Sequence, residues 1–142
     1  PTTHLITLTI TEKGYCHDPA SGKIDWTHPD IIHDLGNLAA PKSAVGYLAA
    51  GLAARMERGG GPITVMSCDN LPHNGAVLKS VLSDFMARAV PDATHWLAQQ
   101  VAFPATMVDR IVPATTDDDV ARLATQIGVT DHGMVKAEPF TQ

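Results

Sequence analysis

The chain has 142 residues, of which 44% are hydrophobic and 18% are charged, and its 15 Asp plus Glu and 10 Lys plus Arg give a formal net charge of −5. This composition is that of one globular domain, and it excludes the basic surface of a nucleic-acid-binding protein. No apolar run approaches the roughly 20 residues that cross a bilayer, so a membrane role is not expected. Two cysteines, Cys16 and Cys68, argue against a disulfide framework and fit a reducing, cytoplasmic location.

The first predicted element is a β-strand near the start of the chain. Residues 5–11 read L-I-T-L-T-I-T, and the alternation of apolar residues with β-branched Thr has the period of a strand. We therefore predict a strand from Leu5 to Thr11. Residues 16–40 are polar and interrupted by proline and glycine, which favours a loop with a short hairpin.

A helix is predicted from Pro41 to Arg58. Apolar residues recur there at steps of three and four, namely Val45, Leu48, Ala49 and Leu52. Such recurrence is typical of an amphipathic helix, proline suits a first helical turn, and the G-G-G-P sequence that follows would end the helix. The apolar run from Ile63 to Ser67 then favours a strand covered on both faces of a parallel sheet.

The next segment has a second helical pattern. Its apolar stripe consists of Val77, Leu78, Val81, Leu82, Phe85 and Met86. This stripe predicts a helix from about Gly75 to Ala89. We expect Asp92 to cap a third, short helix, because aspartate is favoured at helix N-caps.

The last third of the chain is predicted to contain one strand and one helix. Residues 101–112 are expected to pass through a loop into a strand that includes Asp109 and Arg110. A helix is expected to open at Thr115 to Asp117 and to run to Ile127, where the glycine at position 128 would end it. Residues 134–140 are expected to be extended.

Strands that alternate with helices indicate an α/β domain with a mainly parallel sheet and flanking helices. Ligands bind such sheets beyond the carboxyl ends of the strands. Three polar groups follow predicted strands or lie in them: residues 11–13, residues 67–70 and Asp109-Arg110. For Asp69 and Asn70 the alternative is that they only cap the next helix or close a turn.

The sequence gives little support for a phosphate-binding loop or for a metal site. The chain contains no G-x-G-x-x-G turn, and its G-G-G sequence precedes a strand instead of opening a helix, so it is a connector and not a phosphate-binding loop. His17, His28 and His33 share one polar region, but their spacing matches no tight ligand pattern, and we interpret them as loop histidines. No metal is expected.

Four sequence blocks resemble the family of polyol-specific long-chain dehydrogenases that includes mannitol 2-dehydrogenase and fructuronate reductase (D-mannonate oxidoreductase). Residues 101–113, V-A-F-P-A-T-M-V-D-R-I-V-P, resemble the family signature F-P-x-T-M-V-D-R-I-x-P. Residues 8–15, L-T-I-T-E-K-G-Y, and residues 64–75, T-V-M-S-C-D-N-L-P-H-N-G, are similar to two earlier blocks of the family. Residues 138–142, E-P-F-T-Q, resemble the start of its E-P-F-x-Q-W block.

The resemblance implies a zinc-independent oxidoreductase that uses NAD or NADP to interconvert a sugar alcohol or sugar acid with a ketone. Asn70 would donate to the oxyanion that develops during hydride transfer. Val108 and Asp109 would line the nicotinamide and substrate side of the cleft, and Glu12 would lie near the nicotinamide. The general acid/base of the family is a lysine in a C-terminal domain, and neither Lys13 nor Lys136 lies in the matching motif.

We therefore expect residues 1–142 to be the later part of an NAD-binding Rossmann domain, with a doubly wound sheet that is only partly present. The glycine turn and the catalytic lysine would lie in other parts of the same polypeptide. A fragment of this kind should be inactive alone, with an open or covered sheet edge at Leu5–Thr11 and a tendency to self-associate. The alternatives are an enzyme that acts on a hexuronate and a non-catalytic nucleotide-binding or interaction module.

Overall fold

The computed structural model describes residues 2–139, which divide into two compact units on either side of the bond between Met107 and Val108. The first unit contains a parallel sheet with its helices, and the second contains the helix α5 (Asp117–Ile127). Across the described residues, no helix is both long and apolar enough to span a membrane.

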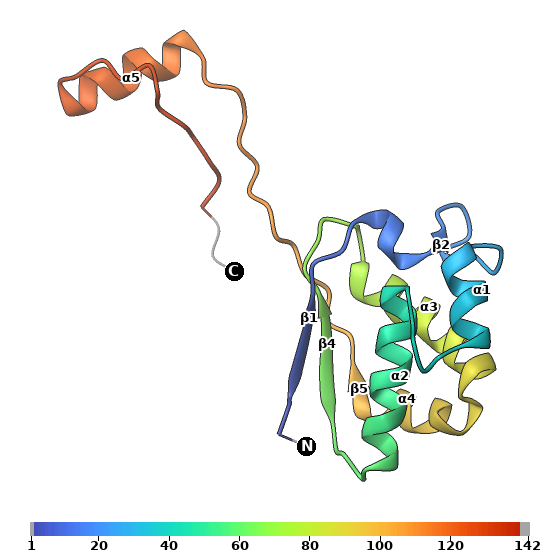
Figure 1. The fold of residues 1–142 in the computed structure, drawn as a ribbon. Coiled ribbons are helices and arrows are strands. Elements are labelled where there is room, and N and C mark those ends of the chain that lie inside the picture. Colours follow the sequence, from blue (N-terminus) through green and yellow to red (C-terminus); the bar gives the residue numbers. More distant parts are fainter. Residues whose placement is uncertain (1, 140–142) are drawn as a thin grey trace. The chain divides into compact units, whose positions relative to one another are not determined.

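Three parallel strands form the sheet of the first unit, in the order β1 (Leu5–Leu8), β4 (Ile63–Ser67) and β5 (Val101–Ala102) (Figure 1). Leu5 pairs with Thr64 and Leu8 with Ser67, so β1 and β4 end at the same edge of the sheet. Helices connect each strand to the next, which confirms the predicted α/β class with a parallel sheet.

The strand β1 ends three residues earlier than predicted. Leu8 pairs with Ser67, the last residue of β4, and the N–H of Cys68 donates to the carbonyl oxygen of Leu8 at 2.7 Å. No partner strand extends beyond this point in the described residues, so the apolar and threonine residues up to Thr11 cannot continue the ladder. Among the described residues β1 pairs with β4 alone, which leaves it at the edge of a small sheet.

The sheet is covered on one face and not on both, so the expectation for Ile63–Ser67 was wrong. Ile63, Val65 and Ser67 are buried, whereas Thr64 and Met66 between them are half-buried. Ile63 and Val65 belong to the core formed with α2 (Ala44–Glu57) and α3 (Asn74–Ala89), and these helices lie to one side of the strands in Figure 1. A nearly continuous apolar sequence can therefore form a strand that is fully buried on only one face of the sheet.

The segment after β1 contains the predicted hairpin and an additional helix. The hairpin consists of β2 (His17–Asp18) and β3 (Lys23–Ile24), and the helix α1 covers Pro29–Gly36. The Nδ1 atom of His28 accepts from the N–H of Asp30 at 3.2 Å and caps this helix. The helix escaped prediction because it has only eight residues and is held by packing of its buried face.

A buried carboxylate joins α1 to α2. Asp34, which is fully buried, accepts hydrogen bonds from the N–H and the hydroxyl of Ser43 at 2.9 and 2.6 Å and from the N–H of Lys42 at 2.8 Å. The hydroxyl of Ser43 in turn accepts from the N–H of Gly46 at 2.9 Å. Ser43 is therefore the N-cap of α2, which begins at Ala44 and not at Pro41.

The remaining helices of the first unit follow β4. Helix α3 buries the predicted apolar stripe, including Leu78, Leu82 and Phe85, and begins at Asn74. The 3-10 turn η2 (Pro91–Ala93) leads into α4 (Thr94–Gln100). Asp92 lies inside this turn and makes no cap hydrogen bond to α4, so its predicted capping role was wrong.

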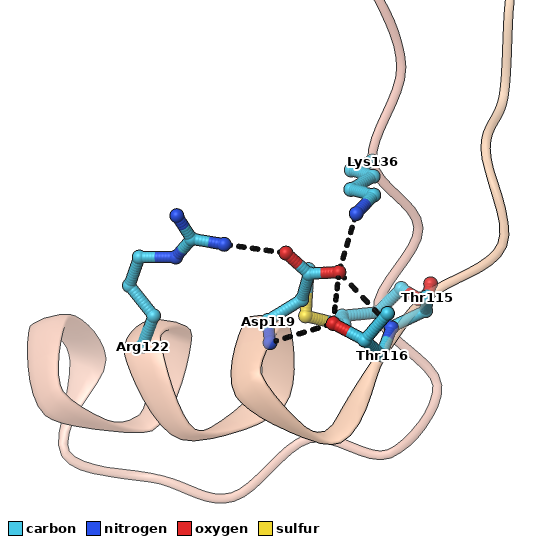
Figure 2. A network of polar contacts seen from close by, with 6 residues as sticks. Thr115, Thr116, Asp119, Arg122 and Lys136 are labelled. Carbon is cyan, nitrogen blue, oxygen red and sulfur yellow. Dashed lines mark hydrogen bonds and ion pairs between the residues drawn. The ribbon is translucent and has the colours of Figure 1, made fainter.

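The second unit is built around α5. The side chains and backbone of Thr116 and Asp119 form a reciprocal capping box at its start, and Gly128, with φ 75°, ends it as predicted. The carboxylate of Asp119 also accepts from Arg122 at 2.5 Å and from Lys136, so the segment after the helix is held to the first turn of α5 (Figure 2).

Residues 101–112 were expected to pass through a loop into a strand, but the order is the reverse, because the strand β5 comes first at Val101–Ala102. Residues 103–116 form no helix or strand, so Asp109 and Arg110 do not lie in one. Pro104 and Pro113 have no N–H to donate, which interrupts a ladder at both ends of this segment. Residues 134–139 also form no strand, and Phe140 lies outside the described residues.

Candidate active site

A pocket lies at the carboxyl ends of β1 and β4. Its volume is about 340 Å³, and it is lined by Thr11, Glu12, Asp69, Asn70, Leu71 and Pro72. Two predicted site residues, Glu12 and Asn70, are therefore brought together on the first unit, and both are exposed. The position agrees with the rule that open parallel sheets bind ligands beyond the carboxyl ends of their strands.

Glu12 is placed by the turn that follows β1. The 3-10 turn η1 covers Glu12–Tyr15, and the N–H of Gly14 donates to the carbonyl oxygen of Thr11 at 2.8 Å. Tyr15, the last residue of the turn, is fully buried in the core. The buried ring of Tyr15 thus anchors the end of the turn, while Glu12 at its start lines the pocket.

The side chains of Tyr15, Ser67 and Asp69 meet at the pocket wall, where η1 and β4 end. The hydroxyl of Tyr15 donates to Asp69 Oδ2 at 2.5 Å and lies 2.6 Å from the hydroxyl of Ser67. The hydroxyl of Ser67 donates to the same carboxylate oxygen at 2.5 Å. This contact joins the end of η1 to the end of β4.

Hydrogen bonds determine the protonation states of Asp69 and Tyr15. Burial alone would raise the pKa of Asp69, but hydrogen bonds from Ser67 and Tyr15 outweigh burial and hold the pKa below its usual range. Burial, followed by the hydrogen bond to Asp69, raises the pKa of Tyr15. The carboxylate is therefore charged and the phenol protonated over the whole physiological range.

Asn70 occupies the middle of a turn closed by Asp69. The N–H of Leu71 donates to Asp69 Oδ1 at 2.8 Å, which is the hydrogen bond of an Asx-turn. Asp69 therefore closes a turn, as the alternative interpretation has it, but it also lines the pocket. Asn70 lines the same pocket and is more exposed than Asp69.

The buried side chain of Asn74 connects the ends of β4 and β5. Its Nδ2 atom donates to Thr106 Oγ1 at 2.9 Å and to the carbonyl oxygen of Asp69 at 3.1 Å, and its Oδ1 atom accepts from the N–H of Thr106 at 3.0 Å. The hydroxyl of Thr106 donates to the carbonyl oxygen of Ser67. These bonds fix both the backbone that precedes Asn70 and the segment that follows β5.

The backbone of Phe103 and Pro104 passes close to the first turn of α3. A Cβ atom at Gly75 would lie 2.5 Å from the carbonyl oxygen of Pro104 and 2.6 Å from that of Phe103. Only glycine therefore allows the chain after β5 to pass over the first turn of α3.

Val108 and Asp109, the other two predicted site residues, begin the second unit. Val108 is half-buried and Asp109 is exposed, in a segment without helix or strand. Their predicted place beside Asn70 and Glu12 stays a prediction.

Four residues support the pocket, namely Tyr15, Ser67, Asn74 and Thr106; the sequence pattern indicated Ser67 only as part of the polar group 67–70 and did not single out the other three. Each of them lies in one of the sequence blocks that carry the family resemblance. The available signal was therefore their presence in three of the four blocks, and the structure shows that hydrogen bonds connect residues from these blocks.

His28, His33 and Cys16 have structural surroundings. His28 caps α1, and His33 Nδ1 lies 2.9 Å from Asp34 Oδ1. Burial, followed by the nearby Asp30, raises the pKa of Cys16 to about 11, which makes a reactive thiolate unfavourable there. Within residues 2–139, no group of three or more His, Cys, Asp or Glu could hold a metal ion.

Comparison with known proteins gives one consistent result. The profile of the family described as mannitol dehydrogenase Rossmann domain matches residues 2–142. The D-mannonate oxidoreductase of Escherichia coli K12 is 47% identical over 142 residues, and the mannitol 2-dehydrogenase of Aspergillus fumigatus Af293 is 42% identical over 144. Each match covers all of this chain and 29% of the relative, so the chain spans less than a third of the curated relatives it matches.

Two solved structures are similar in fold. The ternary complex of Pseudomonas fluorescens mannitol 2-dehydrogenase with NAD and D-mannitol has a TM-score of 0.71 and 42% identity, and covers 98% of this chain and 28% of that chain. A D-sorbitol dehydrogenase in substrate-free form has the same TM-score and 34% identity, with 96% and 28% covered. The first unit is therefore part of a Rossmann domain.

Proposed function

Since this chain belongs to the mannitol dehydrogenase Rossmann domain family, we propose that it forms the later part of the nucleotide-binding domain of an NAD(P)-dependent oxidoreductase. The enzyme interconverts a mannitol-like sugar alcohol and the matching ketose. The observation that carries this proposal is the pocket at the carboxyl ends of β1 and β4, where Glu12 and Asn70 converge from separate sequence blocks. The other parts of the active site belong to other segments of the same polypeptide.

Asn70 supplies an uncharged hydrogen-bond donor to the substrate oxygen. A nicotinamide, when bound, accepts or supplies the hydride. The carbonyl oxygen gains negative charge during reduction, and a donor already in place stabilises that charge without reorganisation. The amide of Asn70 suits this role because its backbone is fixed by the Asx-turn and by Asn74 while its side chain stays exposed.

The pocket residues fit the nicotinamide end of the cofactor. The carboxamide of nicotinamide has both donors and acceptors, and the pocket presents a carboxylate at Glu12 and an amide at Asn70. We assign Glu12 to the nicotinamide side, and Val108 and Asp109 to the border between nicotinamide and substrate. The relative solved with NAD favours NAD, and NADP remains the second choice of cofactor.

A hexuronate is the second candidate substrate. The D-mannonate oxidoreductase of E. coli is 47% identical to this chain, compared with 42% for the fungal mannitol 2-dehydrogenases. The exposed pocket residues of this chain do not include a basic side chain that would pair with a sugar-acid carboxylate, so that recognition would fall to another part of the enzyme.

An activity panel tests the proposal. The full-length protein is assayed with NAD and NADP against mannitol, sorbitol and mannonate, following the absorbance of the reduced nicotinamide. We expect turnover of at least one of these alcohols, undiminished by a metal chelator because the reaction needs no zinc. Lack of turnover with every alcohol and both cofactors, together with cofactor binding, would favour a non-catalytic nucleotide-binding module.

A further inference from the structure

The two carboxylate oxygens of Asp69 hold different parts of the pocket wall. The Oδ2 atom accepts from the hydroxyls of Tyr15 and Ser67, both at 2.5 Å. The Oδ1 atom accepts from the N–H of Leu71 at 2.8 Å and closes the turn that has Asn70 at its centre. Rotation of this carboxylate would therefore release the turn, and the two hydroxyls prevent that rotation.

Tyr15 is fixed independently of the turn. Its ring is fully buried in the core, and the hydroxyl at the end of the ring can only occupy a narrow range of positions. Tyr15 also ends the 3-10 turn that begins with Glu12. The contact between Tyr15 and Asp69 thus holds the two walls of the pocket at a set separation.

We propose that Tyr15 and Ser67 are positioning residues for the Asn70 amide, and that they act through the Asp69 carboxylate. The inference rests on the proposed function, in which Asn70 donates to the substrate oxygen. Neither hydroxyl lines the pocket, so both act without touching the substrate. Their role is to keep the turn in the one conformation that aims the amide.

The reason for a hydrogen-bonded anchor is geometric. Misplacement of a catalytic group by about 1 Å can lower the rate by about 100-fold. Asn70 lies in a short loop and is exposed, so the position of its amide depends on the conformation of the turn that Asp69 closes. A charged carboxylate that accepts from two buried hydroxyls makes stronger hydrogen bonds than a neutral acceptor would.

A double-mutant cycle in the full-length enzyme tests the inference. The variants are Tyr15→Phe, Asn70→Ala and the double variant, with Tyr47→Phe as the matched control because Tyr47 is 64% exposed on α2. Phenylalanine retains the buried ring of Tyr15 and removes only the hydroxyl. We expect Tyr15→Phe to lower kcat by about 10-fold or more while the KM for NAD changes little, and Tyr47→Phe to leave both unchanged.

The decisive value is the effect of Tyr15→Phe when Asn70 is already alanine. A residue that acts through Asn70 has no further effect on kcat in that background, because coupled residues are not additive. An equal loss in both backgrounds, or no loss in either, overturns the positioning role. If Asn70→Ala alone leaves kcat unchanged, the proposed function of Asn70 fails first, so the two failures are distinguishable.

Ser67→Ala provides a second route to the same test. Ser67 is fully buried and donates to the same oxygen of Asp69. If Tyr15→Phe does not fold, Ser67→Ala replaces it in the cycle with the same expectation. A loss of kcat that persists unchanged in the Asn70→Ala background again overturns the inference.

Discussion

The amide group of Asn74 makes a two-way contact with Thr106, donating to its hydroxyl at 2.9 Å and accepting from its N–H at 3.0 Å. The same group donates to the carbonyl oxygens of Ser67 and Asp69 at 3.3 and 3.1 Å. One fully buried side chain therefore satisfies backbone groups at the end of β4 and in the segment that follows β5. The edge of the sheet that carries the candidate site depends on it.

Replacing Asn74 by alanine should destabilise the protein. The change removes these hydrogen bonds and leaves partly buried backbone groups without partners, which costs about 2 kcal/mol. Urea unfolding measures the loss, with Asn37→Ala as the control because Asn37 is exposed at the end of α1. Equal stability of the two variants would contradict the role assigned to Asn74.

Two glycine-to-alanine changes should have opposite signs. Gly75→Ala places a Cβ atom 2.5 Å from the carbonyl oxygen of Pro104, and the displacement of backbone should cost about 1–3 kcal/mol. Gly51→Ala lies in the interior of α2 with no atom within 4 Å of the new Cβ, and it should stabilise the helix by up to about 1 kcal/mol. Melting temperatures of the two variants compare them directly, and a Gly75→Ala variant as stable as the parent would show that the chain after β5 takes another path.

The stability of the first unit should fall in acid through Asp34. Burial opposes ionisation of this carboxyl, but hydrogen bonds from Ser43 and His33 outweigh burial and lower its pKa in the folded state. A lowered folded pKa contributes stability above the unfolded value of about 3.9, and that contribution is lost as the pH falls through the folded pKa.

Unfolding free energies measured from neutral pH down through this range should therefore decline. Asp34→Asn should be less stable than the parent at neutral pH and show a shallower decline in acid. The control Asp92→Asn, at an exposed position, should retain the parent's decline. A decline in Asp34→Asn as steep as in the parent would assign the acid sensitivity to other carboxylates.

The isolated 142-residue polypeptide should not oxidise mannitol at a measurable rate. Its sequence has no G-x-G-x-x-G turn, and neither Lys13 nor Lys136 lies in the motif that carries the acid/base lysine of the resembling family. Catalytic groups that act as a unit lose most of their effect when one is missing. Turnover by the purified polypeptide, at a rate above that of its Asn70→Ala variant, would refute this expectation.

Local sequence patterns correctly predicted the elements whose bounds are set by their own residues and immediate neighbours. Ile63–Ser67 forms a strand over the predicted residues because an apolar run is bounded by proline and polar residues, and α5 ends at Gly128 because glycine adopts the positive φ of a helix end. The strand predicted up to Val112 was wrong because a strand also needs a partner, and β4 pairs with only the first two residues of this segment. Helix α1 depends on the tertiary contacts of Asp34, which sequence spacing does not reveal.

The candidate site was predictable only in part, for the same reason. Glu12 and Asn70 follow strands in blocks with a family resemblance, and the structure shows them lining one pocket. The support beneath them, from Tyr15 to Asp69, joins residues far apart in the chain. Such a contact follows from the parallel pairing of β1 with β4, which sets both loops at the same edge.

The most direct test of the central claim is the turnover number of Asn70→Ala in the full-length oxidoreductase, with Asn37→Ala as the matched control. If Asn70 stabilises the developing negative charge on the substrate oxygen, kcat should fall by about 100-fold or more, the effect of removing an oxyanion donor. The control should keep the parent's kcat, and both variants should remain folded. A kcat for Asn70→Ala equal to that of the parent would contradict the assignment of this pocket as the active site.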